Sequence, residues 1–154
     1  TNSWAKLPKV MDSTLQNLAS DYITIKRISS NSQALSISVF LPPDYNSKNI
    51  TDLKRISNNI IELDLSGIPI GEKEMELVAM CKNLEWLEVD RTPITDAEFI
   101  KLSLKSLYVS ETQISRDGFA QLKEALPNLQ LDYGIDPELK TEFIQKDSIV
   151  DSIQ

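Results

Sequence analysis

A recurring pattern of apolar residues fills the second half of the chain. Four segments, IIELDL, LEWLEV, LKSLYV and LPNLQL, share the order apolar-x-x-apolar-x-apolar, and successive copies start 24, 20 and 22 residues apart. The last four residues of each copy alternate apolar and polar, as a strand with one buried face requires. The pattern therefore predicts four short strands with aligned central residues, which are Leu63, Leu87, Leu107 and Leu129.

Each of the first three predicted strands is followed by an Ile-bearing turn and a helical stretch. In DRTPITD we expect the Thr92 hydroxyl to bond backbone in the turn, Ile94 to fill the interior, and Thr95 or Asp96 to cap the helix. Thr112 takes the place of Thr92 in SETQISR. Spacings of three and four give each helix one apolar face. The residues expected on these faces are Met75, Val78 and either Cys81 or Met80; Phe99 and Leu102; and Phe119, Leu122 and either Ala125 or Leu126.

The region before the repeats reads as a cap. Residues 1–9 are expected to be a linker, and residues 10–59 an N-terminal cap. In the cap, VMDSTLQNLAS predicts a helix with Met11, Leu15 and Leu18 on one face, and DYITIKRISSNSQALSISVFLPP predicts a β-hairpin around the polar turn SSNSQ. Thr51 is then expected to cap a short helix through Leu53 and Ile56.

The region after the repeats predicts a second cap, over residues 136–154. Asp136 is the expected N-cap of its helix and Pro137 its first residue. Leu139, Phe143 and Ile144 would cover the last repeat, and the final residues form a tail.

The repeat region is expected to span residues 60–135, and about residues 60–131 of it resemble the leucine-rich repeat family, in particular short bacterial repeats that read L-x-x-L-x-L-x-x-T-x-I-T-D-x-x-L. The resemblance implies an α/β solenoid with parallel strands on the concave face and helices on the convex face. Two departures stand out, since the second unit is short and no Asn follows the strands to form an asparagine ladder.

The leader ITIKRISSNSQALSISV before LDLSGIPI is also similar to a repeat module that follows membrane helices and a c-type cytochrome domain in some bacterial membrane proteins. That resemblance implies an extracytoplasmic, periplasmic module of a membrane-anchored protein. The haem-attachment motif C-x-x-C-H is absent from the sequence, so no haem role carries over, and we expect no cofactor.

Charge and composition argue against several classes of function. Residues 1–59 carry seven Lys and Arg against four Asp and Glu, whereas residues 60–154 carry nine against nineteen. An acidic surface repels phosphate backbones, so nucleic-acid binding is not expected. No apolar run reaches the roughly 18 residues of a membrane helix, so we expect no direct membrane insertion. The sequence holds no His and one Cys, and Cys81 in LVAMCKN is expected to be a buried structural thiol.

The residues between the strand leucines are expected to point to the concave face, where they form three columns. These are Glu62, Trp86, Ser106 and Asn128; Asp64, Glu88, Tyr108 and Gln130; and Ser66, Asp90, Ser110 and Asp132. Trp86 and Tyr108, rimmed by carboxylates, suit a basic or amphipathic protein partner. The predicted partner-binding residues are Trp86, Tyr108, Glu62, Asp64, Glu88 and Asp90.

We therefore expect a non-enzymatic protein–protein interaction module, with no catalytic residue and no metal ligand. Two structural alternatives stay open for Trp86, which a cap could cover or which the sheet could simply tolerate. The alternative function is a glycan-acting or carbohydrate-binding domain that uses the same carboxylates and aromatic rings. Asp64, Glu88 and Asp90 could also bind Ca²⁺, but the sequence disfavours this alternative because no compact D-x-D-x-D-G loop is present.

Overall fold

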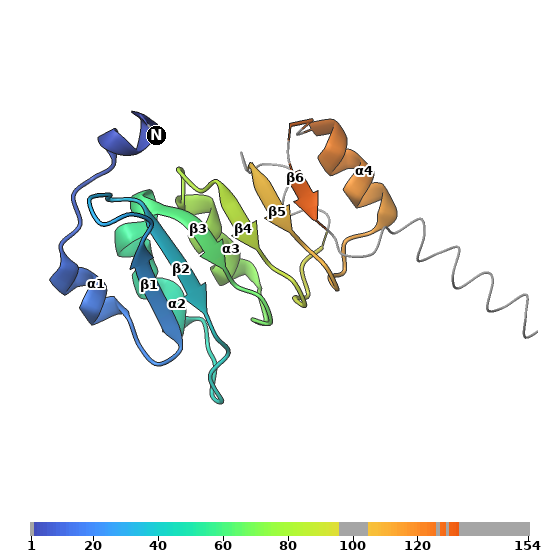
Figure 1. The fold of residues 1–154 in the computed structure, drawn as a ribbon. Coiled ribbons are helices and arrows are strands. Elements are labelled where there is room, and N and C mark those ends of the chain that lie inside the picture. Colours follow the sequence, from blue (N-terminus) through green and yellow to red (C-terminus); the bar gives the residue numbers. More distant parts are fainter. Residues whose placement is uncertain (1, 96–104, 126, 129, 133–154) are drawn as a thin grey trace, which may run out of the picture.

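A single mixed sheet organises the molecule. The structure is a computed structural model that describes residues 2–95, 105–125, 127–128 and 130–132. Six strands follow one another across the sheet in chain order (Figure 1). They are β1 (Ile23–Arg27), β2 (Leu35–Val39), β3 (Ile60–Asp64), β4 (Trp86–Glu88), β5 (Ser106–Tyr108) and β6 (Gln130–Asp132). The first pair is antiparallel and every later pair is parallel, so the chain is mixed α/β.

The described helices precede the first strand or lie between β2 and β3, between β3 and β4, and between β5 and β6. They are the 3₁₀ helix η1 (Asn2–Lys6), α1 (Asp12–Leu18), α2 (Lys48–Thr51), the 3₁₀ helix η2 (Asp52–Asn59), α3 (Glu72–Met80) and α4 (Arg116–Ala125). α1 lies beside β1, while α2 and α3 lie behind the sheet in the view of Figure 1. Parallel neighbours need such crossover connections because a tight turn can join only antiparallel strands.

The core lies between the sheet and these helices. The strand leucines Leu63, Leu65, Leu87 and Leu107 are completely buried, as their alternation predicts. Leu77 of α3 is equally buried and packs in the same cluster. Burying each such side chain contributes about 1.5–3 kcal/mol relative to leaving it in water. Because side chains alternate along a strand, the residues between these buried leucines point to the opposite face of the sheet.

The two threonines after the strands have the predicted role. The Thr92 hydroxyl donates to the Val89 carbonyl at 2.7 Å, and the Thr112 hydroxyl donates to the Val109 carbonyl at 2.9 Å. Ile94 is buried, as expected for a residue that fills the interior after the turn. Each hydroxyl satisfies a carbonyl that the chain reversal takes out of the strand ladder.

The same turns contain a left-handed residue at one equivalent position. Gly67 has φ of 76°, and Arg91 and Glu111 both have φ of 54°. The amide of Gly67 donates to the Asp90 carbonyl at 2.9 Å, and that of Arg91 donates to the Ser110 carbonyl at 2.8 Å. These bonds continue the pairing of neighbouring strands into the turns, which at Arg91 helps to hold a non-glycine residue in a conformation that is uncommon for it.

The helices after the turns begin in two different ways. At α4, the Ser115 hydroxyl accepts from the Gly118 amide at 3.0 Å, which is an ordinary N-cap bond. Gly71 stands before α3 and has no side chain to cap it. There the buried Glu74 reaches back and accepts from the Gly71 amide at 3.0 Å, while its other oxygen accepts from the Tyr45 hydroxyl at 2.8 Å.

The strand of the fourth repeat, which is β6 in the structure, does not have the predicted register. Ser106 lies opposite Gln130 and Tyr108 opposite Asp132, so Leu131 and not Leu129 faces Leu107. The predicted columns that placed Asn128 beside Ser106 and Gln130 beside Tyr108 are therefore wrong by two residues. A shift of two keeps the same side chains on the same face, because the side-chain period of a strand is two. The apolar pattern alone could not separate the two registers.

Three predictions about the region before the repeats are corrected, and one open choice in α3 is decided. Thr51 precedes η2 but its side chain does not cap that helix; it is the last residue of α2, and its hydroxyl donates to the Lys48 carbonyl at 3.3 Å. Met11 precedes α1 and is exposed, whereas Leu15 is buried as predicted. Residues 2–6, expected as linker, form the 3₁₀ helix η1. The open choice between Cys81 and Met80 is decided for Cys81, which is buried.

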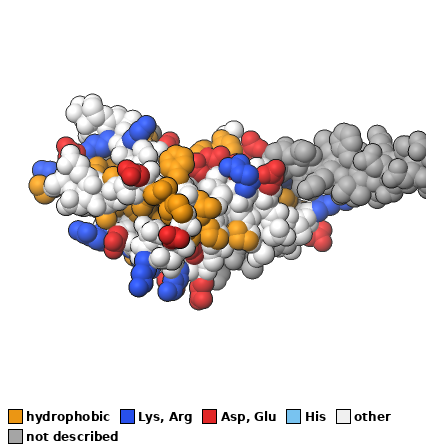
Figure 2. Space-filling model, turned by 90° about the horizontal axis from the view of Figure 1, so that it is seen from below, with side chains coloured by type: hydrophobic (Ala, Val, Ile, Leu, Met, Phe, Trp, Pro, Cys, Tyr) orange, Lys and Arg blue, Asp and Glu red, His pale blue; other side chains and the backbone are white. Residues whose placement is uncertain are grey.

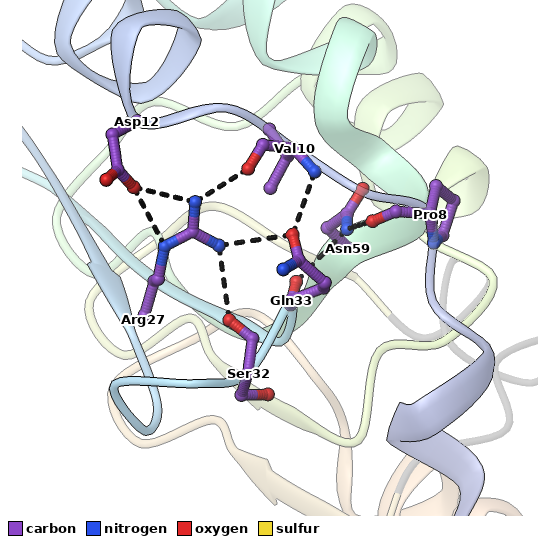
Figure 3. Close-up of polar contacts among 7 residues, drawn as sticks. All are labelled: Pro8, Val10, Asp12, Arg27, Ser32, Gln33 and Asn59. Atoms are coloured by element: carbon purple, nitrogen blue, oxygen red, sulfur yellow. Dashed lines mark hydrogen bonds and ion pairs between the residues drawn. The ribbon is translucent and has the colours of Figure 1, made fainter.

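A polar cluster joins the N-terminal segment to the hairpin (Figure 3). The Arg27 guanidinium donates to Asp12 Oδ1 at 2.7 and 3.0 Å, to the Val10 carbonyl at 2.6 Å, to the Ser32 carbonyl at 3.1 Å and to Gln33 Oε1 at 3.2 Å. Nearby, Asn59 Nδ2 donates to the carbonyls of Pro8 at 2.6 Å and Gln33 at 3.0 Å. These contacts hold the segment before α1 against the first two strands.

Some predicted elements lie outside the described residues. They are the helix of the second repeat with Asp96, Phe99 and Leu102, and the C-terminal cap over residues 136–154 with Asp136, Pro137, Leu139, Phe143 and Ile144.

Candidate functional site

Strand register brings the six predicted partner-binding residues onto one face of the sheet. Glu62 pairs with Trp86, which pairs with Ser106, and one pleat further along Asp64 pairs with Glu88, which pairs with Tyr108. Asp90 follows β4 on the same side. All six side chains are half-buried, and they point away from the leucine side that packs against the helices. We call this face the outward face.

Trp86 and Tyr108 form an aromatic pair on the outward face. Their ring centroids lie 5.1 Å apart, with the ring planes inclined at 52°. A tilted contact at this distance is a favourable aromatic arrangement. The alternative in which the N-terminal cap covers Trp86 does not hold for the hairpin, because β1 and β2 extend the sheet sideways and do not fold over it. The C-terminal cap that could also cover Trp86 lies outside the described residues.

Besides Glu62, which pairs with Trp86, three carboxyl groups lie near the aromatic pair: Asp64 on β3, Glu88 on β4 and Asp90 just after β4, together called the acidic cluster. Asp64 Oδ1 accepts from the Ser66 amide at 2.9 Å, and Asp90 Oδ1 accepts from the Ser110 amide at 2.7 Å. These two acids therefore help to shape the turns as well as carrying charge. Glu88 lies directly opposite Asp64 in the parallel pair of β3 and β4.

The environment of Glu88 favours its protonated form. Burial, then the negative charge of Asp64, then hydrogen bonding with Asp90 and Asp64 raise the pKa of the Glu88 carboxyl to about 7. Desolvation and a like charge both penalise an ionised acid, so their effects add. A cation brought to this cluster would offset both penalties, which makes the cluster a favourable place for a Lys or Arg side chain.

Two aromatic residues on the hairpin extend the outward face and were not predicted as site residues. Thr24 lies opposite Ser38, and Ser38 lies opposite Asp64. Two residues further, the Phe40 amide donates to the Tyr22 carbonyl at 2.7 Å, so Tyr22 and Phe40 end up on this same face. The alternation in YITIKR and SISVF contains the signal. This signal did not identify Tyr22 and Phe40 as site residues, because residues 10–59 are predicted to form an N-terminal cap and not part of a binding surface.

Among the described residues, neither the acidic side chains, nor the cavities, nor Cys81 form an arrangement that supports metal-ion or thiol catalysis. No group of three or more Asp, Glu or Cys side chains there is arranged to hold a metal ion. Two cavities lie beside the N-terminal segment: one of about 210 Å³ is also lined by residues at the start of β3 and just before β4 and β5, and one of about 390 Å³ is also lined by η2. Neither is lined by Asp64, Glu88 or Asp90. Cys81 is buried, its thiol donates to the Leu77 carbonyl at 3.2 Å, and burial raises its pKa to about 12, which disfavours the nucleophilic thiolate.

Comparison with protein-family models, with curated proteins and with solved structures finds no match for this chain. Among the described helices, none is both long enough and apolar enough to cross a membrane.

Proposed function

We propose that the chain is a short leucine-rich repeat solenoid that serves as a non-enzymatic protein–protein interaction module. The solenoid is supported by five strands that run parallel in chain order, with equivalent left-handed turn residues and equivalent Thr–carbonyl bonds after successive strands. Coils of this kind bury their apolar side only against their neighbours, which explains the completely buried leucine in the middle of each of β3, β4 and β5.

The observation that carries the binding function is the Trp86–Tyr108 pair beside three carboxyl groups. Large aromatic side chains on the outer side of a sheet have no core to enter, and both rings remain only half-buried. Aromatic anchors next to charged groups are the usual centres of binding energy in protein interfaces. The acids select a basic or amphipathic protein segment, because they repel acidic ones.

A display experiment tests this function. Random 12-residue peptides are selected against the wild-type chain, and the selected set is then measured against Trp86→Ala and against the matched control Met80→Ala on α3. We expect basic peptides with apolar residues to be enriched, and their affinity to fall about tenfold or more in Trp86→Ala while Met80→Ala binds normally. Selected peptides that bind Trp86→Ala and wild type equally would exclude the outward face as the binding surface.

The same aromatic pair with nearby acids also favours the alternative, a carbohydrate-binding domain, because sugars stack on aromatic rings and bond to carboxylates. A glycan array distinguishes the two functions. Binding to a defined glycan that disappears in both Trp86→Ala and Glu88→Gln, in a chain that selects no peptide, would replace the protein-binding proposal with the carbohydrate one.

We also propose that the module lies outside the cytoplasm, in the periplasm of a bacterial membrane-anchored protein. The support is the resemblance of the hairpin leader and of the LDLSGIPI unit that follows it. Alkaline phosphatase fused to this module within its native reading frame would be active in cells if the module is exported. An inactive fusion that is present at full length would place it in the cytoplasm.

A further inference from the structure

The outward face has a second aromatic site, at the hairpin. Phe40 and Tyr22 are 57% and 40% exposed, and the neighbouring Leu41 is also exposed. They lie where the parallel strands finish. Figure 2 views the molecule from that end and shows apolar side chains gathered in its middle, with acidic side chains beside them. The exposed apolar surface therefore does not stop at Trp86 and Tyr108.

The spacing of the two aromatic sites follows from sheet geometry. Phe40 follows β2, whereas Trp86 lies on β4 and Tyr108 on β5, so two or three strand spacings separate them. With about 4.8 Å between strands and about 3.3 Å per residue along them, the diagonal from Phe40 to either ring is about 16 Å. In an extended peptide, side chains four residues apart point to the same face and leave the backbone about 13 Å apart, so two apolar side chains that lean outward can reach both aromatic sites.

The acidic cluster lies between the two aromatic sites. On the grid of strands and pleats, Asp64 on β3 and Glu88 on β4 occupy the middle of the diagonal, and Asp90 lies beside it. The hydroxyl-bearing Ser38 and Ser66 separate Phe40 from the acids. The order across the face is therefore apolar, acidic, apolar.

We propose that the outward face is a two-anchor surface for one extended peptide segment of a protein partner, with apolar side chains four residues apart and a Lys or Arg at the residue midway between them. This inference rests on the proposed function and deepens it by stating the pattern of the partner. Charge complementarity selects this occupant: the acidic centre attracts a basic centre, and the two aromatic ends take the apolar side chains. An acidic peptide or one with a single anchor fits only part of the surface.

A defined probe tests the pattern. The acetylated, amidated peptide Leu-Gly-Lys-Gly-Leu has its apolar residues four apart and its cation midway between them, so all three side chains point to one face when the peptide is extended. It is titrated into the uniformly ¹⁵N-labelled full chain, and amide shifts report both the affinity and the residues affected. We expect the amides of Tyr22, Phe40, Trp86 and Tyr108 to shift together with one dissociation constant, and peptides with Glu in place of Lys or Ser in place of both leucines to produce no shifts.

Variants at the two ends separate this proposal from the broader function. Phe40→Ser removes an exposed side chain, so the fold is expected to persist, and binding should weaken about tenfold, as it should in Trp86→Ala. Met80→Ser, which removes an exposed apolar side chain on α3, is the matched control and should bind as wild type does.

Each other result contradicts the proposal in a distinct way. If Trp86→Ala weakens binding and Phe40→Ser does not, the face binds through one anchor, and the two-anchor surface is wrong while the interaction function stands. If neither variant changes affinity, both are wrong. If millimolar peptide shifts no amide, the apolar–basic–apolar pattern is wrong, and the peptides chosen in the display experiment then decide whether the outward face binds another pattern.

Discussion

Removing the Arg27 side chain should destabilise the protein far more than removing the charge of its partner Asp12. The Arg27 side chain is 19% exposed and that of Asp12 is 80% exposed, so the ion pair itself is worth only about 0–1 kcal/mol. The larger effect comes from the part-buried carbonyls of Val10 and Ser32, which lose the Arg27 donor, whereas Gln33 Oε1 keeps the Val10 amide as a donor at 2.8 Å (Figure 3). Leaving a buried acceptor without a donor costs about 1–3 kcal/mol, and water recovers part of that. We expect Arg27→Met to cost about 2–4 kcal/mol and Asp12→Asn less than about 1 kcal/mol.

Urea unfolding followed by circular dichroism measures both changes. With a slope of about 1–3 kcal/mol per molar urea, Arg27→Met should lower the midpoint by about 1–2 M at unchanged slope. Arg27→Lys keeps the charge but cannot reach several acceptors at once, so it should lie between the two. Equal midpoints for Arg27→Met and Asp12→Asn, or a wild-type midpoint for Arg27→Lys, would refute the claim that the forked donor set matters.

Three further predictions concern the core, the turns and the acidic cluster. Leu87→Ala, at a completely buried site, should cost about 2–5 kcal/mol in urea unfolding, and a loss below about 1 kcal/mol would contradict its place in the core. Thr92→Val should cost about 1–2 kcal/mol and more than Thr112→Val, because Thr92 is buried and Thr112 is half-buried; the reverse order would argue against burial as the cause. The raised pKa of Glu88 means that the folded state binds its proton more tightly than the unfolded state, so stability should fall as pH rises from about 4.5 to about 7. Glu88→Gln should flatten this part of the thermal-melting profile relative to the control Glu62→Gln, and identical profiles would show that Glu88 does not titrate in this range.

The acidic cluster shows why the pH effect needs the folded structure. Glu88 faces Asp64 on β3 and Tyr108 on β5, with Asp90 following on its own strand. Along the chain, Asp64 and Glu88 are 24 residues apart, so they are not neighbours in the unfolded state. Parallel pairing places them opposite each other, and that proximity, together with burial, raises the pKa of the Glu88 carboxyl.

Much of the fold could be predicted from local patterns. Alternating apolar residues predicted β1 to β5 and their buried faces, and spacings of three and four predicted α1, α3 and α4. Thr92 and Thr112 could be assigned to the turns because a hydroxyl next to a chain reversal finds a nearby carbonyl without help from distant residues. Trp86, Tyr108 and the carboxylates could be assigned to one face because the strand period alone decides which side chains point outward.

Other features depend on contacts between distant segments. Leu129 and Leu131 satisfy the apolar pattern equally, and only pairing with β5 selects Leu131. Arg27 finds its acceptors on the segment before α1 and in the hairpin turn, and Glu74 finds Tyr45 across 29 residues. Most important for function, the parallel pairing of β2 with β3 turns the hairpin from a separate cap into an extension of the sheet.

The sequence by itself therefore determined which residues are buried and which point outward, because that depends on a period within each element. The tertiary structure decided which outward residues are neighbours, because strand order and register are set by pairing between segments that lie far apart in the chain. Phe40 and Tyr22 could be read from the sequence as the end of a hairpin. Only the sheet places them on the same surface as Trp86, Tyr108 and the acids between them.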